Sequence, residues 1–182
     1  MALNNYIQFR CCVHDLLESD KVQQMSEYIQ HGNTTTLEHC ILVSYMSFSI
    51  CKRLGLNYYA AARGGLLHDL YLYDWHDLEI NITNAREILK LHGFTHPKKA
   101  LDNASRFFEL SSLESNIIHR HMFPLTPIPP SSPEGLVVCI MDKVAALMEM
   151  SGLCRMLFVK RITSLTRVSE ALVQKIIDSR NI

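Results

Sequence analysis

The sequence lacks net charge and long apolar runs, and each absence removes a class of protein. Eighteen lysines and arginines balance eighteen aspartates and glutamates, so the formal net charge is zero. No bulk positive field is therefore available to hold a nucleic-acid backbone or an anionic membrane. The longest nearly apolar stretch, residues 41–51, is interrupted by serines and is far shorter than the roughly 20 residues of a membrane-spanning helix. We therefore expect neither a nucleic-acid polymer nor a membrane as a partner.

The chain also lacks the features of a secreted protein. Its first residues do not form a basic segment followed by an apolar one, so they do not resemble a signal peptide. The six cysteines are scattered through apolar segments and include no C-x-x-C pair. This distribution is typical of reduced thiols in a core. The sequence therefore predicts a cytoplasmic protein.

Strands are lacking as well, because no segment alternates apolar and polar residues with a period of two. Helical periodicity recurs along the chain instead, with no internal repeat and no low-complexity tail. These patterns predict a single all-α domain of about eight helices over residues 1–182. Its motif-bearing core is expected at about 34–150, with the N-terminal and C-terminal helices packed on that core.

Capping residues predict where several helices begin. Thr35 with Glu38, and Ser111 with Glu114, each form a capping box. Pro97 is typical of a first helical residue and is expected to open a helix that ends at residue 108.

Other helices are predicted from periodicity together with glycines near their ends. A helix over 20–31 is expected to end at Gly32, one over 83–93 at its last glycine, and two more fill 155–180. The helix predicted over 57–69 contains Gly64 and Gly65, and each glycine costs roughly 1 kcal/mol relative to alanine. This cost predicts the close approach of a neighbouring backbone.

Four titratable residues occupy helix positions with apolar neighbours: His39, His68, Asp69 and Asp142. No cation lies three or four residues from Asp142, and Lys143 is expected to point about 100° away from it. A bare buried carboxylate costs several kcal/mol, so each aspartate needs a distant partner. Singly, either histidine is a core imidazole bonded to a backbone carbonyl. One divalent cation bound by all four residues satisfies them together.

The order of these residues carries a family resemblance. The pattern reads His39…His68-Asp69…Asp142, within TLEHCILVSYM, GGLLHDLYLYDWH and VVCIMDKVAALME. Over residues 34–150 the chain resembles the HD-domain superfamily, and it is most similar to small, stand-alone bacterial HD phosphohydrolase-like proteins. The resemblance implies an α-helical bundle and a bound divalent metal. It also implies, as in most members, hydrolysis of a phosphoester or phosphoanhydride.

Two further histidines extend the resemblance to a dinuclear site. HD proteins with two metals add histidines between the His-Asp pair and the last aspartate, and the central aspartate bridges the ions. His96 and His121 lie in that interval. The alternatives are a helix N-cap for His96 and a helix-dipole partner for His121. His119 faces away from His121 on a regular helix, although local unwinding would reverse their order.

The ligand types limit the metal and suggest a mechanism. Imidazole and carboxylate without thiolate suit one or two ions of Mn, Fe, Co, Ni or Zn, and Mg less well. Water at such a centre is acidified and attacks a phosphorus atom that the metal polarises, with Asp69 as a catalytic residue.

Candidates to complete the reaction lie near these ligands in the sequence. Arg63 and Lys143, and less so Lys98 and Lys99, are expected to bind phosphate, the alternative being solvated surface cations. Asp74 and His76 are expected to orient water or to protonate a leaving group, the alternative being a loop salt bridge.

The predicted function is therefore a divalent-metal-dependent phosphohydrolase acting on a small phosphorylated molecule or nucleotide. Leu72 and Tyr73 replace the acidic pair of guanosine tetraphosphate hydrolases, and the glycine-tyrosine-proline motif of cyclic-di-GMP phosphodiesterases is absent. Two alternatives stay open: a di-iron HD-type oxygenase and a metal-stabilised regulatory or binding domain. Apolar residues near the end of the chain fit either a homo-oligomer interface or the core: Met148, Met150, Met156 and Phe158.

Overall fold

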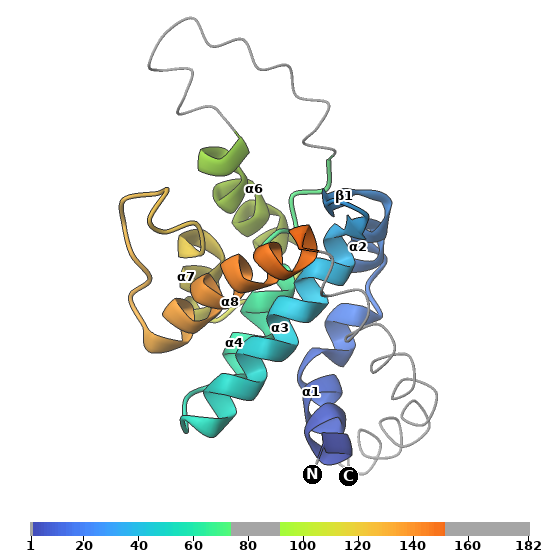
Figure 1. The fold of residues 1–182 in the computed structure, drawn as a ribbon, viewed down its shortest axis with the longest axis vertical. Helices are drawn as coiled ribbons and strands as arrows, with labels where there is room; N and C mark the ends of the chain where they lie inside the picture. Colours follow the sequence, from blue (N-terminus) through green and yellow to red (C-terminus); the bar gives the residue numbers. More distant parts are fainter. Residues whose placement is uncertain (1, 74–91, 152–182) are drawn as a thin grey trace, which may run out of the picture.

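The computed structural model describes residues 2–73 and 92–151 of the chain, and these residues form a helical bundle with one small β-hairpin (Figure 1). The all-α prediction is therefore confirmed. The elements are α1 (Ala2–Leu17), α2 (Asp20–Gln23), the 3-10 helix η1 (Gln24–Glu27), β1 (Ile29–His31), β2 (Thr34–Thr35), α3 (Thr36–Arg53), α4 (Tyr58–Leu67), α6 (His92–Phe107), α7 (Ser112–Arg120) and α8 (Pro133–Met150). None of the described helices is long and apolar enough to cross a membrane.

Helices α3 and α4 form the centre of the bundle. Helix α8 crosses both of them, α1 and α7 pack against α4, and α6 packs against α7 (Figure 1). Apolar side chains from opposite faces of α3, including Cys40, Val43 and Phe48, are completely buried. An amphipathic surface helix buries only one face. The burial of α3 on several sides therefore explains its central place.

Gly65 permits α3 and α4 to approach one another closely. A Cβ added to Gly65 would lie 3.1 Å from Ser44 Cα, and Ser44 Oγ donates a hydrogen bond of 2.6 Å to the Ala62 carbonyl. The neighbouring Gly64 faces the side chain of Ile117 instead. The predicted backbone approach is therefore confirmed at Gly65.

Replacement of Gly65 by alanine is expected to lower the free energy of unfolding by about 1–3 kcal/mol, the usual cost of overpacking. Helix propensity alone would raise it by about 1 kcal/mol. The sign of the change in the free energy of unfolding therefore shows whether steric crowding or helix propensity has the larger effect at this position. Urea-induced unfolding followed by circular dichroism measures it. A more stable variant would show that α3 moves to accept the methyl group.

Two capping boxes begin helices where the sequence predicts them. Thr35 Oγ1 accepts from Glu38 N while the Glu38 carboxylate accepts from Thr35 N, and Ser111 and Glu114 make the same pair of bonds at α7. Helix α8 begins at Pro133, after the N-cap Ser132, whose side chain accepts from Gly135 N. These signals succeed because a cap satisfies helix N–H groups locally, without help from the rest of the fold.

The helix predicted over 20–31 is wrong in its second half, and so is the prediction that strands are absent. The chain leaves η1 at Tyr28 and forms the antiparallel hairpin of β1 and β2, with Gly32 in the turn at φ +58°. β-branched Thr34 and Thr35 follow the turn, and such residues favour strands. Gly32 therefore serves a hairpin turn rather than a helix end.

The prediction that Pro97 opens a helix is also wrong. Helix α6 already begins at His92 and carries Pro97 in its interior, so Gly93 lies within a helix rather than ending one. A proline inside a helix removes one main-chain hydrogen bond, which the surrounding helix tolerates here. Residues 83–91 of the helix predicted over 83–93, and the two helices predicted over 155–180, lie outside the described residues.

Candidate metal centre

All six predicted metal ligands come together at one end of the central helices. The C-cap of α4 is His68, followed directly by Asp69, and the C-cap of α7 is His121. The first turns of α3 and α6 and the middle of α8 supply the other three: His39, His96 and Asp142. The four histidines and Asp69 are buried, and the Asp142 side chain is 13% exposed. Five separate elements therefore converge on one buried polar cluster.

One half of the cluster consists of His39, His68 and Asp142 with one oxygen of Asp69. His39 Nε2 lies 3.2 Å from Asp142 Oδ1, and His68 Nε2 lies 3.6 Å from the same oxygen. His68 Nε2 is also 3.4 Å from Asp69 Oδ2. Two ring nitrogens and two carboxylate oxygens thus surround a common point.

The other half consists of His96 and His121 with the second oxygen of Asp69. The two Nε2 atoms are 2.9 Å apart, and they lie 3.2 Å and 3.5 Å from Asp69 Oδ1. Asp69 therefore presents Oδ1 to this half and Oδ2 to the other. His119 is half-buried and is not part of this group, so the structure favours His121 as the sequence analysis did.

Hydrogen bonds within the cluster leave some of its buried atoms without a partner, whereas a divalent cation would bind these atoms. Among the described residues, His68 Nε2 and Asp69 Oδ1 are buried and make no hydrogen bond. A buried polar atom without a partner costs about 1–3 kcal/mol. A cation between these groups accepts a lone pair from each of them, and imidazole and carboxylate are common ligands of Mn, Fe, Co, Ni and Zn.

Hydrogen bonds on the far side of two rings fix which nitrogen faces the cluster. His68 Nδ1 lies 2.8 Å from the Gly65 carbonyl, and His121 Nδ1 lies 2.7 Å from the Ile118 carbonyl. A carbonyl can only accept, so each Nδ1 carries the proton and donates it. Once Nε2 carries no proton, a ring held in this way directs the lone pair of that nitrogen into the cluster, as metal-bound histidines do.

The cluster attracts positive charge. Burial opposes ionisation, yet hydrogen bonds with Asp142 and Glu149 raise the pKa of His39 to about 10. Burial likewise opposes ionisation of Asp142, but its hydrogen bond with His39 and the nearby His68 ring nevertheless hold the pKa of that carboxyl well below its usual range. Protons on the rings therefore balance the buried carboxylates, and a cation that binds must displace them.

The second half is electrostatically different. Burial and the nearby positive charge of His68 lower the pKa of His121 to about 3, so this ring is neutral and keeps its lone pair. The pKa of Asp69 is lowered in spite of burial, because His68 and His96 favour its charged form. Asp69 therefore stays ionised between the two halves.

Three residues beside the cluster were missed in the sequence analysis. The Glu149 carboxylate contacts His39 Nδ1, the His31 ring centre lies 5.6 Å from that of His39, and Gln30 Nε2 donates a 2.7 Å hydrogen bond to Asp69 Oδ2. Glu149 was findable, because it follows Asp142 by seven residues, which is two turns on one helix face. Gln30 and His31 were hidden by the helix wrongly predicted over 20–31.

Lys143 lies at the edge of the cluster, although its orientation was wrongly predicted. Its Nζ is 3.6 Å from Asp142 Oδ2 and donates to the carbonyls of His121 and Cys139 at 2.9 and 3.1 Å. A long flexible side chain can turn back along its helix, so the 100° separation of the two Cβ positions did not decide where the charge lies. The prediction that no local cation reaches Asp142 is therefore also wrong.

Arg63 is neither a surface cation nor a member of the cluster. It is 6% exposed, and its Nε and Nη1 are 2.9 Å and 2.6 Å from the carboxylates of Glu114 and Asp15. Two carboxylates already engage this guanidinium, and its carbon lies 5.4 Å from the centre of the Tyr59 ring. We therefore assign Arg63 a structural role rather than phosphate binding.

The other residues predicted to bind phosphate or to assist the reaction are exposed or lie outside the described part of the chain. Lys98 and Lys99 are exposed on α6, and Lys99 Nζ lies 4.4 Å from the centre of the Tyr73 ring. Asp74 and His76 lie outside the described residues, so their predicted roles stay predictions.

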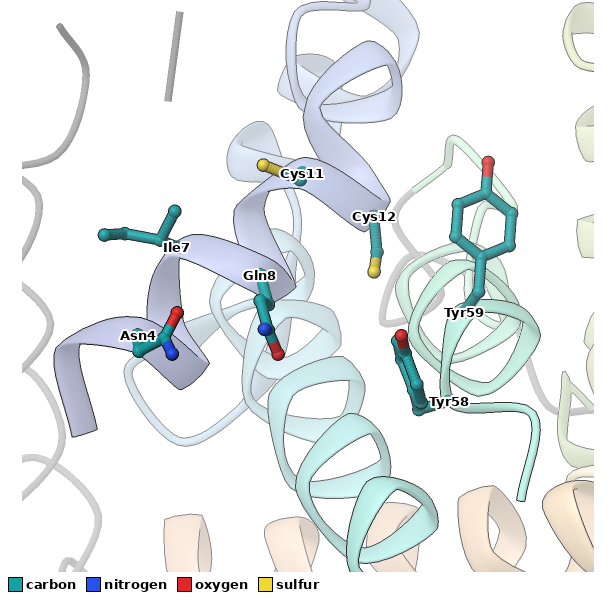
Figure 2. Close-up of a pocket in the computed structure, with 7 residues that line it drawn as sticks. All are labelled: Asn4, Ile7, Gln8, Cys11, Cys12, Tyr58 and Tyr59. Carbon is teal, nitrogen blue, oxygen red and sulfur yellow. The ribbon is translucent and has the colours of Figure 1, made fainter. Parts of the chain in front are cut away.

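A cavity of about 300 Å³ lies between α1 and α4, apart from the cluster (Figure 2). Its lining has two thiols and two phenols among mostly small polar and apolar groups: Asn4, Ile7, Gln8, Cys11, Cys12, Tyr58 and Tyr59. None of these residues is a predicted ligand or catalytic residue. We therefore place the chemistry at the histidine–aspartate cluster.

The fold and the cluster together define a helical protein with a candidate metal centre of four histidines and two aspartates. The HD domain family matches residues 36–147, which include all six of these side chains and more than half of the chain. The chain therefore belongs to the HD domain family, whose members are mostly metal-dependent hydrolases. No curated protein and no solved structure shows significant similarity to it.

Proposed function

We propose that this protein is a divalent-metal-dependent phosphohydrolase acting on a small phosphorylated molecule or nucleotide. The observation that carries the proposal is the position of Asp69, whose two carboxylate oxygens face different sets of ring nitrogens. His39, His68 and Asp142 would hold one ion, His96 and His121 the other, and Asp69 both. When bound, such ions lower the pKa of water and polarise a phosphoryl oxygen.

Charge favours an anionic substrate. The six ligands contribute two negative charges, from Asp69 and Asp142, and two divalent cations exceed that charge. The loaded centre is therefore cationic and attracts a phosphate. Lys143 adds a further positive charge at the edge of the cluster, where hydrogen bonds to two carbonyls hold its ammonium group. A side chain fixed in this way can bind a phosphate oxygen with little further loss of conformational freedom.

The test uses the full chain after chelator treatment, reloaded separately with Mn, Fe, Co, Ni or Zn. Phosphate release is measured from p-nitrophenyl phosphate and from a panel of nucleotides. We expect release only after metal is added, and none from His68→Ala. The matched control is His14→Ala, because His14 lies on α1 outside the cluster.

Two results would contradict the proposal. Oxygen consumption by the iron-loaded protein without phosphate release would favour a di-iron oxygenase. Metal binding with neither activity, on any of the substrates and with any of the metals, would favour a regulatory or binding domain.

A further inference from the structure

Gln30 holds the carboxylate that joins the two halves of the cluster. Its Nε2 donates a 2.7 Å hydrogen bond to Asp69 Oδ2, and Gln30 is the buried middle residue of β1. This bond comes from outside the ligand set and engages only one of the two oxygens. It therefore fixes the rotation of the Asp69 carboxylate and keeps Oδ1 directed at His96 and His121.

The Gln30 amide is itself oriented by two hydroxyls. Tyr71 OH donates to Gln30 Oε1, and Thr36 Oγ1 lies 3.2 Å from the same oxygen. The reversed amide would place Oε1 against the Asp69 carboxylate, where two acceptors would repel one another. The network therefore holds the NH₂ group of Gln30 toward Asp69.

Glu149 performs a corresponding task for His39. Its oxygens lie 2.9 Å and 3.1 Å from His39 Nδ1, and its side chain is fully buried. A carboxylate can only accept here, so His39 donates from Nδ1 and presents Nε2 to Asp142. Carboxylates commonly orient a metal-binding histidine in this way.

Both residues lie outside the part of the chain that matches the family, which covers 36–147. Gln30 comes from the hairpin before α3, and Glu149 from the last turn of α8. The segments just before and just after the matched region thus each engage one residue of the cluster.

We infer that Gln30 and Glu149 are positioning residues of this metal centre: Gln30 orients Asp69 for both ions, and Glu149 orients His39 for one. This inference rests on the proposed metal centre. It makes the hairpin and the last turn of α8 necessary for tight metal binding, in addition to the residues that contact the ions.

The experiment is a Mn²⁺ titration of chelator-treated full chain by calorimetry, with electron paramagnetic resonance of the loaded protein. Wild type is expected to bind two Mn²⁺ and to show the signal of a spin-coupled pair. Gln30→Met is expected to weaken Mn²⁺ binding by about 10–100-fold and to lose the coupled signal. Tyr71→Phe keeps the glutamine and removes one hydroxyl, so we expect a weaker effect of about two- to tenfold.

Glu149 is tested by a pair of variants. Glu149→Leu is expected to weaken one ion by about 10–100-fold and to spare the ion of the His96 half. Glu149→Gln keeps an acceptor for His39 Nδ1 and should recover part of that loss. The controls are Gln24→Met, at a half-buried glutamine that contacts Tyr28, and Glu134→Gln, at a buried carboxylate that accepts from Asn57 N. Both are expected to bind Mn²⁺ as wild type does.

Thermal unfolding in chelator separates positioning from folding. A lower midpoint with unchanged Mn²⁺ affinity would overturn the inference, because it would make these residues merely structural. Unchanged affinity in Gln30→Met, Tyr71→Phe and Glu149→Leu would overturn it while leaving the metal centre intact. A wild type that binds no Mn²⁺ and none of the other four metals would overturn the proposed function and this inference together.

Discussion

Asp69→Asn is expected to lower metal-dependent phosphate release by roughly a thousandfold or more, since it disables groups that act as one unit. The variant keeps the shape of the side chain but loses the negative charge between the two halves. It also replaces one oxygen by an NH₂ group, which cannot bind a cation. Asp69 Oδ2 accepts a hydrogen bond from Gln30 and lies 3.4 Å from His68 Nε2. Its Oδ1 lies 3.2 Å and 3.5 Å from the Nε2 atoms of His96 and His121. Its two oxygens therefore face different halves of the cluster.

The measurements are the rate of phosphate release and the bound metal, determined by mass spectrometry. About two ions per chain in wild type should fall to one or fewer. Asp102→Asn is the matched control, because Asp102 is exposed on α6 and lies outside the cluster. Full activity in Asp69→Asn would place the catalytic centre elsewhere, and full metal content with lost activity would limit Asp69 to a role in the reaction.

Four of the six candidate ligands were predictable because each violates a local rule, whereas His96 and His121 were predicted from the family resemblance. An aspartate or histidine among apolar neighbours on a helix has no partner one turn away, so the sequence itself indicates that a more distant one is needed. Their order along the chain then resembles a known family. Asp69 and Asp142 illustrate this best, since neither has a cation three or four residues away.

The residues behind the ligands were less accessible for two different reasons. Glu149 follows Asp142 by seven residues and therefore lies on the same helix face. A glutamate near a helix end is commonly exposed, however, so the spacing alone did not single it out. The position of Gln30 beside Asp69 depends on the hairpin. The polarity pattern of so short a segment fits a helix as well as a strand, so the hairpin was not predicted. In the folded chain, Thr36 N donates a hydrogen bond to the Tyr28 carbonyl, and this bond between residues eight positions apart favours the hairpin over a helix.

Arg63 shows what the sequence could not supply. Its partners Asp15 and Glu114 are 48 and 51 residues away along the chain. Nothing in the local pattern distinguishes a cation that binds substrate from one that joins three helices. Proximity in sequence to His68 suggested the first, whereas the packing of α1, α4 and α7 produces the second.

Arg63→Met is therefore expected to lower the free energy of unfolding by about 3–5 kcal/mol, the usual cost of leaving a buried ion without its partner. Glu114 is only 4% exposed and would lose the Arg63 Nε bond, whereas Asp15 is 60% exposed and would return to water. Asp15→Asn, the matched control, should cost about 1 kcal/mol or less. Urea-induced unfolding measures both variants.

The same variants decide whether Arg63 also acts in the reaction. The double variant Arg63→Met with Glu114→Gln removes both buried charges, and its amide oxygen can still accept from Ser111 N in the capping box of α7. It should therefore recover much of the lost stability, because neither side chain then needs a counter-ion. If Arg63 is structural, the folded double variant releases phosphate at the wild-type rate with an unchanged KM. A raised KM in a fully folded double variant would instead show that the guanidinium leaves its ion pairs to bind the substrate phosphate.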